Sequence, residues 1–190
     1  MRKVVVSEFV TLDGVMDDPG GSEGTAHGGW SFKIRNSEDQ GKFKTDELFA
    51  SDALLLGRVT YQGFAAAWPT MPGTGAYGER MNSLPKYVVS TTLKAVDWNN
   101  SRLISQNVGD EVSKLKQQPG QDILVFGSGN LVQTLMEHDL VDQYNLLVHS
   151  VVLGSGKRLF RDGTQASLKL VETKTFGSGV VALIYQPDRK

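Results

Sequence analysis

The stretch Ala53-Leu54-Leu55-Leu56-Gly57-Arg58-Val59-Thr60 decides the fold class of this 190-residue chain. Its first four residues form a continuous apolar run, which is typical of a strand buried on both faces. A helix-like segment, 60–67, follows directly. The free backbone N–H groups at such a strand-to-helix turn suit a phosphate, and the Arg58 guanidinium can grip one with two hydrogen bonds. The alternative is a plain turn glycine beside a solvated arginine.

Strands and helices alternate outward from this stretch to about residue 153, and only strands follow. The expected strands are 4–10, 53–56, 86–90, 102–105, 122–126 and 144–153, and the expected helices are 38–50, 60–67, 110–116 and 130–138. Segments 168–176 and 180–186 predict a closing hairpin. Segments 17–29 and 68–78 are rich in glycine or proline and are expected to be loops. The order predicts one α/β domain over residues 1–190, with a mixed, mostly parallel central sheet and an antiparallel C-terminal hairpin.

Composition excludes several classes of function. The formal net charge is −1 and no basic stripe stands out, so the sequence lacks the clustered positive charge that is typical of nucleic-acid-binding proteins. The chain has no cysteine, which removes disulfides, thiolate catalysis and cysteine metal sites, and its three histidines lack metal-ligand spacing. The apolar N-terminal run breaks at Ser7-Glu8, too early for a signal peptide, and no segment approaches a membrane span. A cytoplasmic protein without a bound metal is expected.

Two further strand ends carry residues suited to a nucleotide. Ser90-Thr91 follow the strand Tyr87-Val88-Val89, and their hydroxyls fit a 2′-phosphate or a ribose, although such residues also form local turns. The segment 127–131 (Gly127, Ser128, Gly129, Asn130, Leu131) joins a strand to a helix and can form an anion-binding nest, or a plain capped turn. Because the carboxyl ends of parallel strands share one edge of a sheet, the three strand ends together predict a long anionic ligand.

Other phosphate-binding and catalytic motifs match less well. Gly154-Ser155-Gly156-Lys157 lacks the first glycine and the final Ser or Thr of a Walker loop, so a loop after a long strand is expected there. The Gly-x-Gly at Gly127 has Val132 in place of the third glycine of a dinucleotide fingerprint. It also comes late in the chain, which argues against an ordinary Rossmann dehydrogenase. No Gly-x-Ser-x-Gly elbow of a hydrolase is present.

Five ordered motifs resemble a known family. They are TLDGV (11–15), LLLGRVTY (54–61), VVST (88–91), VFGSGNLVQTL (125–135) and HSVVLGSGKRLF (149–160). Together they resemble the dihydrofolate reductase-like superfamily, in the branch of the riboflavin-biosynthesis reductase (RibD C-terminal) domain. The resemblance implies a three-layer α/β/α fold, NADPH as the cofactor and a homodimer. By position it implies that Arg58 and Ser90-Thr91 meet the 2′-phosphate end, and that Thr60 and 127–131 hold the pyrophosphate. Gly57 and Val59 are expected to contact the cofactor as well.

The chain also departs from that pattern. A Gly-Gly pair, often joined by a cis peptide in dihydrofolate reductases, is replaced by Gly127-Ser128, so the geometry of this bond is open. In dihydrofolate reductases a carboxylate that binds the pterin ring is expected five residues after the tryptophan, and here Arg35 stands five residues after Trp30. The zinc-bearing deaminase domain of the riboflavin enzyme is absent from this sequence. The chain therefore resembles the stand-alone members of the branch.

The resulting hypothesis is an NADPH-dependent reductase that transfers hydride to a C=N or C=O carbon of a small heterocycle, pterin-like or ribosylaminopyrimidine-like. Asp13, Trp30 and Glu47 are the candidates for substrate contact, no catalytic residue is assigned, and the loop 17–29 is a candidate lid. Asp13 also suits a simple turn and Glu47 a solvated helix face. The alternative is an NADP(H)-binding module of the same fold without efficient catalysis.

Overall fold

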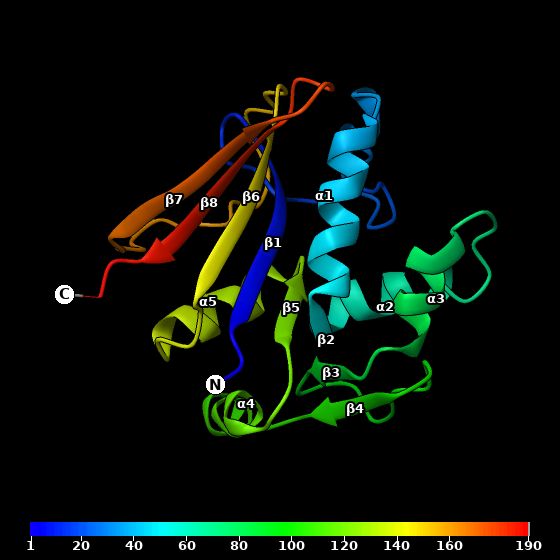
Figure 1. Cartoon of the computed structure of the whole chain (residues 1–190), viewed down its shortest axis with the longest axis vertical. Coiled ribbons are helices and arrows are strands. Elements are labelled where there is room, and N and C mark those ends of the chain that lie inside the picture. Colours follow the sequence, from blue (N-terminus) through cyan, green and yellow to red (C-terminus); the bar gives the residue numbers. More distant parts are fainter. Residues whose placement is uncertain (190) are drawn as a thin grey trace.

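A computed structural model describes residues 1–189 as one α/β unit (Figure 1). The strands in that range are β1 (Val4–Thr11), β2 (Ser51–Gly57), β3 (Lys86–Val89), β4 (Ser101–Ile104), β5 (Asp122–Phe126), β6 (Gln143–His149), β7 (Leu168–Thr175) and β8 (Val181–Pro187). The helices are α1 (Glu38–Phe49), α2 (Arg58–Ala67), α3 (Gly75–Ser83), α4 (Val108–Gln117) and α5 (Gly129–Glu137), with a short 3-10 helix at Trp30–Lys33.

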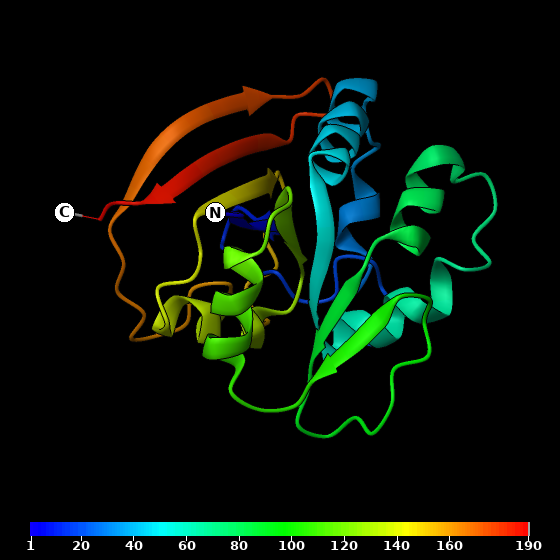
Figure 2. The ribbon, with the colours of Figure 1, turned by 60° about the horizontal axis from the view of Figure 1, so that its bottom comes forward.

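The strands form one sheet in the order β4-β3-β2-β5-β1-β6-β8-β7. All neighbours from β4 to β6 are parallel, and β8 runs antiparallel to both β6 and β7. Figure 2 shows the β7–β8 hairpin at one edge of the molecule and β3–β4 at the opposite edge. The mixed, mostly parallel sheet and its antiparallel C-terminal hairpin are confirmed.

Helices cover both faces of the sheet, which gives the predicted three layers. On one face α1, α2 and α3 contribute Leu48, Tyr61 and Met81 to a core cluster with residues of β2 and β5. On the other face α4 and α5 pack Val112, Leu115, Leu131 and Leu135 against a second cluster. The apolar run of β2 divides between the two clusters, with Leu54 and Leu56 on the first face and Leu55 on the second. This explains why the run does not alternate.

Two expected boundaries were wrong. The segment 68–78 is not loop throughout, because α3 begins at Gly75 and buries Gly78 and Met81. Its two glycines and polar residues hide the helical period, and tertiary burial outweighs propensity there. The strand expected at 144–153 ends at His149, after which the Val151 N–H donates to the His149 carbonyl in a tight turn (2.7 Å) and leaves Val152 exposed.

Candidate functional site

One large cavity of about 1000 Å³ opens at the carboxyl ends of β3, β2 and β5 and continues beside β1. Three inter-strand steps separate β3 from β1, so the cavity spans about 14 Å of the sheet edge. Its lining includes every residue that was predicted to bind the cofactor: Gly57, Arg58, Val59, Thr60, Ser90, Thr91, Gly127, Ser128, Gly129, Asn130 and Leu131. The three strand ends expected to share one ligand therefore share one cavity.

The ends of β2 and β5 are joined by the Ser128 side chain. Its Oγ accepts a hydrogen bond from the Gly57 N–H (2.7 Å) and lies 3.1 Å from the Thr60 hydroxyl. A Cβ on Gly57 would come within 3.0 Å of Ser128 Oγ, and a Cβ on Gly127 within 2.7 Å of Thr60 Oγ1. Gly127 and Ser128 both have positive φ, 55° and 70°, and the peptide between them is trans. The two turns thus fit against each other only because glycine occupies both close contacts.

Both helices that start at this edge leave their first N–H groups without a side-chain cap. Gly57 is the N-cap of α2 and Ser128 the N-cap of α5, and neither makes a capping side-chain bond. Uncapped N–H groups and the positive end of the helix dipole favour an anion. Arg58 is exposed beside them, and its guanidinium contacts only Gln62 among the described side chains (3.0 Å).

The Ser90 side chain stabilises the turn that follows β3. Its Oγ accepts hydrogen bonds from the backbone N–H groups of Thr92 (3.2 Å) and Leu93 (3.0 Å). Ser90 is buried, whereas Thr91 is exposed at the cavity wall. Ser90 therefore shapes the turn that presents the Thr91 hydroxyl.

Three basic residues close together in the sequence, Lys157, Arg158 and Arg161, line the cavity and were not predicted to do so. Arg161 bonds the Asn130 side chain, and Gln133 of α5 donates to the Leu159 carbonyl (2.6 Å), so this loop is fixed beside the start of α5. The segment does not match a Walker loop, but it brings positive charge to the cavity by tertiary contact. The cluster of three cations within five residues was the available signal.

The glycine-rich loop 17–29 folds around one buried carboxylate. Asp18 accepts hydrogen bonds from the backbone N–H groups of Glu23 (3.0 Å) and Thr25 (3.1 Å), and its own carbonyl accepts from Gly21 and Gly29. These hydrogen bonds lower the pKa of Asp18 against the opposing effect of its burial, which is the largest single influence. The loop already lines the cavity through its residues 17–20, 22 and 23.

At the β1 end, Glu47 lies in a buried polar cluster. Its carboxylate pairs with Lys44 and accepts hydrogen bonds from Ser7 (2.7 Å) and Asn145 (3.1 Å). Its side chain is only 7% exposed, so Glu47 is not a solvated helix charge. Ser7 and Lys44 line the cavity, and Glu47 lies behind them.

Glu8 is the residue at this end that sequence reasoning missed. It lines the cavity, is 3% exposed, and its Oε1 has no hydrogen-bond partner among the described residues. Burial raises its pKa well above the usual range; the Lys44 ammonium opposes this rise and the Glu47 carboxylate adds to it. The signal was present in the sequence as a carboxylate inside the largely apolar strand 4–10.

Asp13 and Trp30 lie behind the cavity wall and are not among the residues that line it. Asp13 accepts hydrogen bonds from the Thr11 hydroxyl (2.6 Å) and the N–H groups of Leu153 (3.2 Å) and Gly154 (2.7 Å). These bonds lower its pKa to about 2, the Thr11 bond most of all. Trp30 is fully buried and donates its indole N–H to the Asp17 carbonyl (2.7 Å). Both side chains therefore hold the loops that form the wall.

The donor set fits a dinucleotide with phosphate groups. Two uncapped helix starts and the side chains of Arg58, Arg158 and Arg161 contribute to the cavity lining, and aromatic side chains line it too. The lining aromatics are Phe9, Phe32, Phe64, Trp68, Tyr77 and Phe126. Cationic and N–H donors suit phosphates, and flat apolar walls suit the rings of a nucleotide or a heterocycle.

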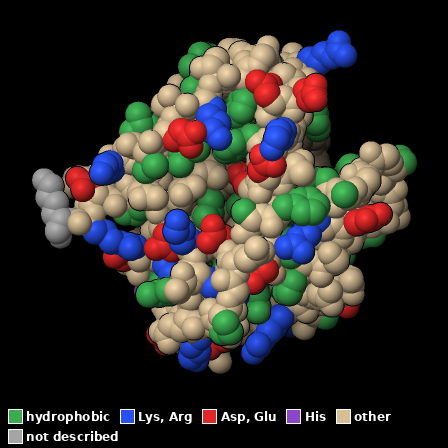
Figure 3. Space-filling view, in the orientation of Figure 1, with side chains coloured by type: hydrophobic (Ala, Val, Ile, Leu, Met, Phe, Trp, Pro, Cys, Tyr) green, Lys and Arg blue, Asp and Glu red, His purple; other side chains and the backbone are tan. Residues whose placement is uncertain are grey.

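A second, smaller cavity of about 300 Å³ lies beside α4 and is lined by Tyr87, Arg102, Glu111 and Lys114 among others. Figure 3 shows positive and negative side chains interspersed on one face. No three His, Cys, Asp or Glu side chains of residues 1–189 come together as a metal site would require. No helix in the described range is both long and apolar enough to cross a bilayer.

Comparison with known proteins gives a consistent result. The sequence profile of the RibD C-terminal domain family matches residues 2–182. The uncharacterized protein YyaP of Bacillus subtilis (strain 168) is 36% identical over 188 residues, covering 97% of this chain and 94% of that protein. Two solved structures share the fold. One is a protein assigned to riboflavin biosynthesis from Shewanella sp. PV-4 (TM-score 0.76, 20% identity, 98% and 99% of the two chains). The other is dihydrofolate reductase from Enterococcus faecalis with NADP(H) and RAB-propyl (TM-score 0.63, 11% identity, 98% and 97%).

Proposed function

The chain belongs to the RibD C-terminal domain family, and from this premise we propose that it is an NADPH-dependent reductase of a small heterocyclic substrate, pterin-like or ribosylaminopyrimidine-like. The observation that carries the proposal is the continuity of the cavity. Groups suited to phosphate at the ends of β3, β2 and β5 and a buried carboxyl on β1 line the same space. A cofactor and a second ligand can therefore meet inside it.

The residues divide into two groups along the cavity. Arg58 and Thr91 would hold the 2′-phosphate, and Thr60 with the 127–131 turn would hold the pyrophosphate. Arg158 and Arg161 add positive charge to the cavity, and Arg161 contacts Asn130 of α5. NADPH, when bound, supplies the hydride for a C=N or C=O carbon, while the protein orients both ligands and excludes water.

Cofactor binding is tested first, by titration of the parent protein with NADPH and NADH while the nicotinamide fluorescence is followed. Arg58→Ala is expected to weaken NADPH binding at least tenfold and to leave NADH almost unchanged, because only NADPH carries the 2′-phosphate. Arg102→Ala, an exposed arginine on β4 outside this cavity, is the matched control. The assignment fails if the parent shows no saturable NADPH binding, or if Arg58→Ala behaves like the parent.

Turnover is tested separately, by following the loss of NADPH absorbance with a panel of dihydropterins and aminopyrimidines. Consumption of NADPH that depends on the added heterocycle supports the reductase. Saturable NADPH binding without consumption of NADPH on any member of the panel would favour an NADP(H)-binding module.

We also propose that the protein is a cytoplasmic homodimer. Light scattering on the purified protein measures its mass and so tests the dimer.

A further inference from the structure

The β1 end of the cavity holds an ionisable group with no hydrogen-bond partner in the described part of the chain. Glu8 follows Ser7, which lies opposite Phe126, the last residue of β5. Beyond this point β1 has no neighbour on the β5 side, so Glu8 borders the cavity although it is in a central strand. It is 3% exposed, and Oε1 is buried with no hydrogen-bond partner among residues 1–189. A buried polar atom left unpaired is costly, so a ligand that pairs with it is favoured.

The charges around Glu8 do not balance in its ionised form. The cation that acts on Glu8 is Lys44, whose ammonium is already paired with Glu47 and hydrogen-bonded to Ser7 (2.7 Å). The side chains of Lys44 and Glu47 are 14% and 7% exposed, so this pair is shielded from solvent. An ionised Glu8 would place a second, uncompensated carboxylate beside it. Burial accordingly raises the pKa of Glu8 well above its usual range.

We propose that Glu8 acts as a neutral carboxyl that recognises the substrate, and that it binds the lactam edge, an N–H beside a C=O, of a planar heterocycle. The inference rests on the proposed function, because it places the substrate at the β1 end of the cofactor cavity. It also assigns a specificity-determining residue that the sequence motifs did not indicate.

The chemistry of a protonated carboxyl carries this assignment. It offers one O–H donor beside one carbonyl acceptor, whereas an ionised carboxylate offers acceptors only. A lactam presents the complementary pair, N–H and C=O, and forms two hydrogen bonds with a neutral carboxyl. A protonated amidine presents two donors and would match the ionised form instead. Phe9 and Phe126, which line the same end of the cavity, give apolar surfaces for a flat ring.

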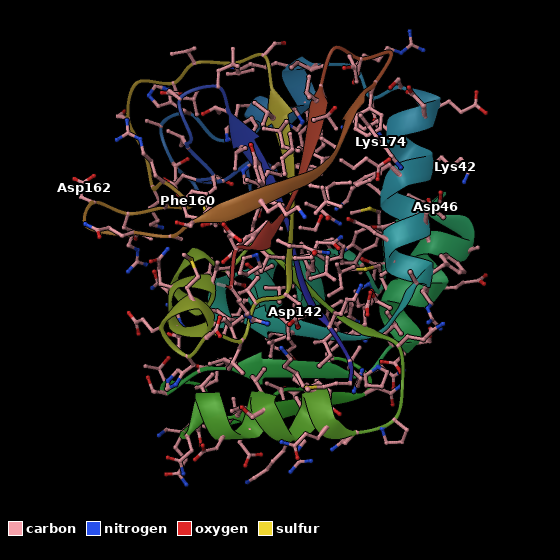
Figure 4. The ribbon with its side chains drawn as sticks, turned by 60° about the vertical axis from the view of Figure 1, so that its left-hand side comes forward. Lys42, Asp46, Asp142, Phe160, Asp162 and Lys174 are labelled. Atoms are coloured by element: carbon pink, nitrogen blue, oxygen red, sulfur yellow. The ribbon has the colours of Figure 1, made fainter. Side chains whose placement is uncertain are left out.

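Two variants and two probe ligands distinguish a neutral Glu8 carboxyl from an ionised one. Glu8→Gln keeps a donor beside an acceptor and cannot ionise, and Glu8→Leu removes both polar atoms. The probes are pterin, which has a lactam edge, and 2,4-diaminopteridine, which has an amidine edge. Asp46→Asn is the control: Figure 4 shows Asp46 and Lys42 on the outer side of α1, where they form an exposed ion pair (2.5 Å). Binding is measured by calorimetry, with and without NADPH.

The parent and Glu8→Gln are expected to bind pterin within about threefold of each other, and Glu8→Leu at least tenfold more weakly. The inference is overturned if Glu8→Leu binds pterin as the parent does. It is also overturned if the parent prefers 2,4-diaminopteridine and Glu8→Gln loses that preference, since Glu8 would then act as an anion. Absence of NADPH binding in the parent counts against the proposed function, whereas the pterin titration without NADPH still decides the role of Glu8. Unchanged NADPH binding in both variants shows that they are folded.

Discussion

Removal of the Ser128 hydroxyl should destabilise the protein by an amount that can be worked out from its contacts. In Ser128→Ala the Gly57 N–H loses its partner, a hydrogen bond of 2.7 Å in a half-buried position. An unsatisfied donor of this kind costs about 1–3 kcal/mol. The backbone strain at φ 70° is the same for Ser and Ala and does not contribute to the difference.

Ser128→Gly separates the hydroxyl from the backbone. It loses the same hydrogen bond, but glycine adopts a positive φ without the clash that costs other residues about 1–2 kcal/mol. Ser128→Gly should therefore be about 1 kcal/mol more stable than Ser128→Ala, the reverse of the usual order of glycine and alanine in a helix.

Equilibrium urea unfolding followed by tryptophan fluorescence measures both differences. Ser155→Ala, an exposed serine in the 154–156 turn, is the matched control and should leave the free energy of unfolding unchanged. The reasoning is refuted if Ser128→Ala unfolds within about 0.5 kcal/mol of the parent, or if Ser128→Gly is the less stable of the two.

Four further predictions concern Lys86, Asp13 and Gly127. Lys86, 1% exposed, donates to three backbone carbonyls, so Lys86→Met should cost about 3 kcal/mol in urea unfolding by leaving them unpaired. Burial also lowers the pKa of Lys86 from 10.5 to about 8, because the folded state disfavours the charged form. The free energy of unfolding of the parent should therefore rise between pH 8 and pH 10.5, and Lys86→Met should not show this rise. A flat difference between the two proteins over that range would contradict this. The pKa of Asp13 is lowered to about 2, so the stability that its ionised carboxylate contributes should be present above pH 4 and lost as the pH falls toward 2. The difference in stability between the parent and Asp13→Asn should therefore shrink between pH 4 and pH 2. Thermal unfolding measured over this pH range tests it. Gly127→Ala should destabilise the fold and weaken NADPH binding, because its Cβ would lie 2.7 Å from Thr60 Oγ1 at a φ of 55°; unchanged affinity for NADPH would argue against a role for this turn.

Much of the fold could be predicted from local pattern. The apolar run of β2 and its glycine marked a buried strand entering a helix, and the late strands marked the hairpin. The helix α3 was missed because its nine residues include two glycines and its helical character depends on the burial of Met81. Burial of that kind is a property of the whole structure.

The candidate site was predictable at its cofactor end and not at its other end. Strand ends followed by glycine, arginine or serine are local signals, and they meet because parallel strands end at one edge. Glu8 and Arg161 depend on which strands become neighbours and on how a distant loop returns to α5. Glu47 was found as a carboxylate, but only the fold shows that it is already paired with Lys44.

The position of β1 in the sheet also has a consequence for biosynthesis. β1 is synthesised before its two neighbours in the sheet, β5 and β6. Val5 therefore cannot complete its strand pairing until Gln143 has been synthesised. At ordinary rates of translation this delay is on the order of ten seconds. During it, an apolar strand with unpaired edges is exposed, which is where chaperones bind and aggregation starts. Glu8, the unpaired carboxyl of the cavity, lies in that strand, where a charged residue during translation would also discourage misassociation.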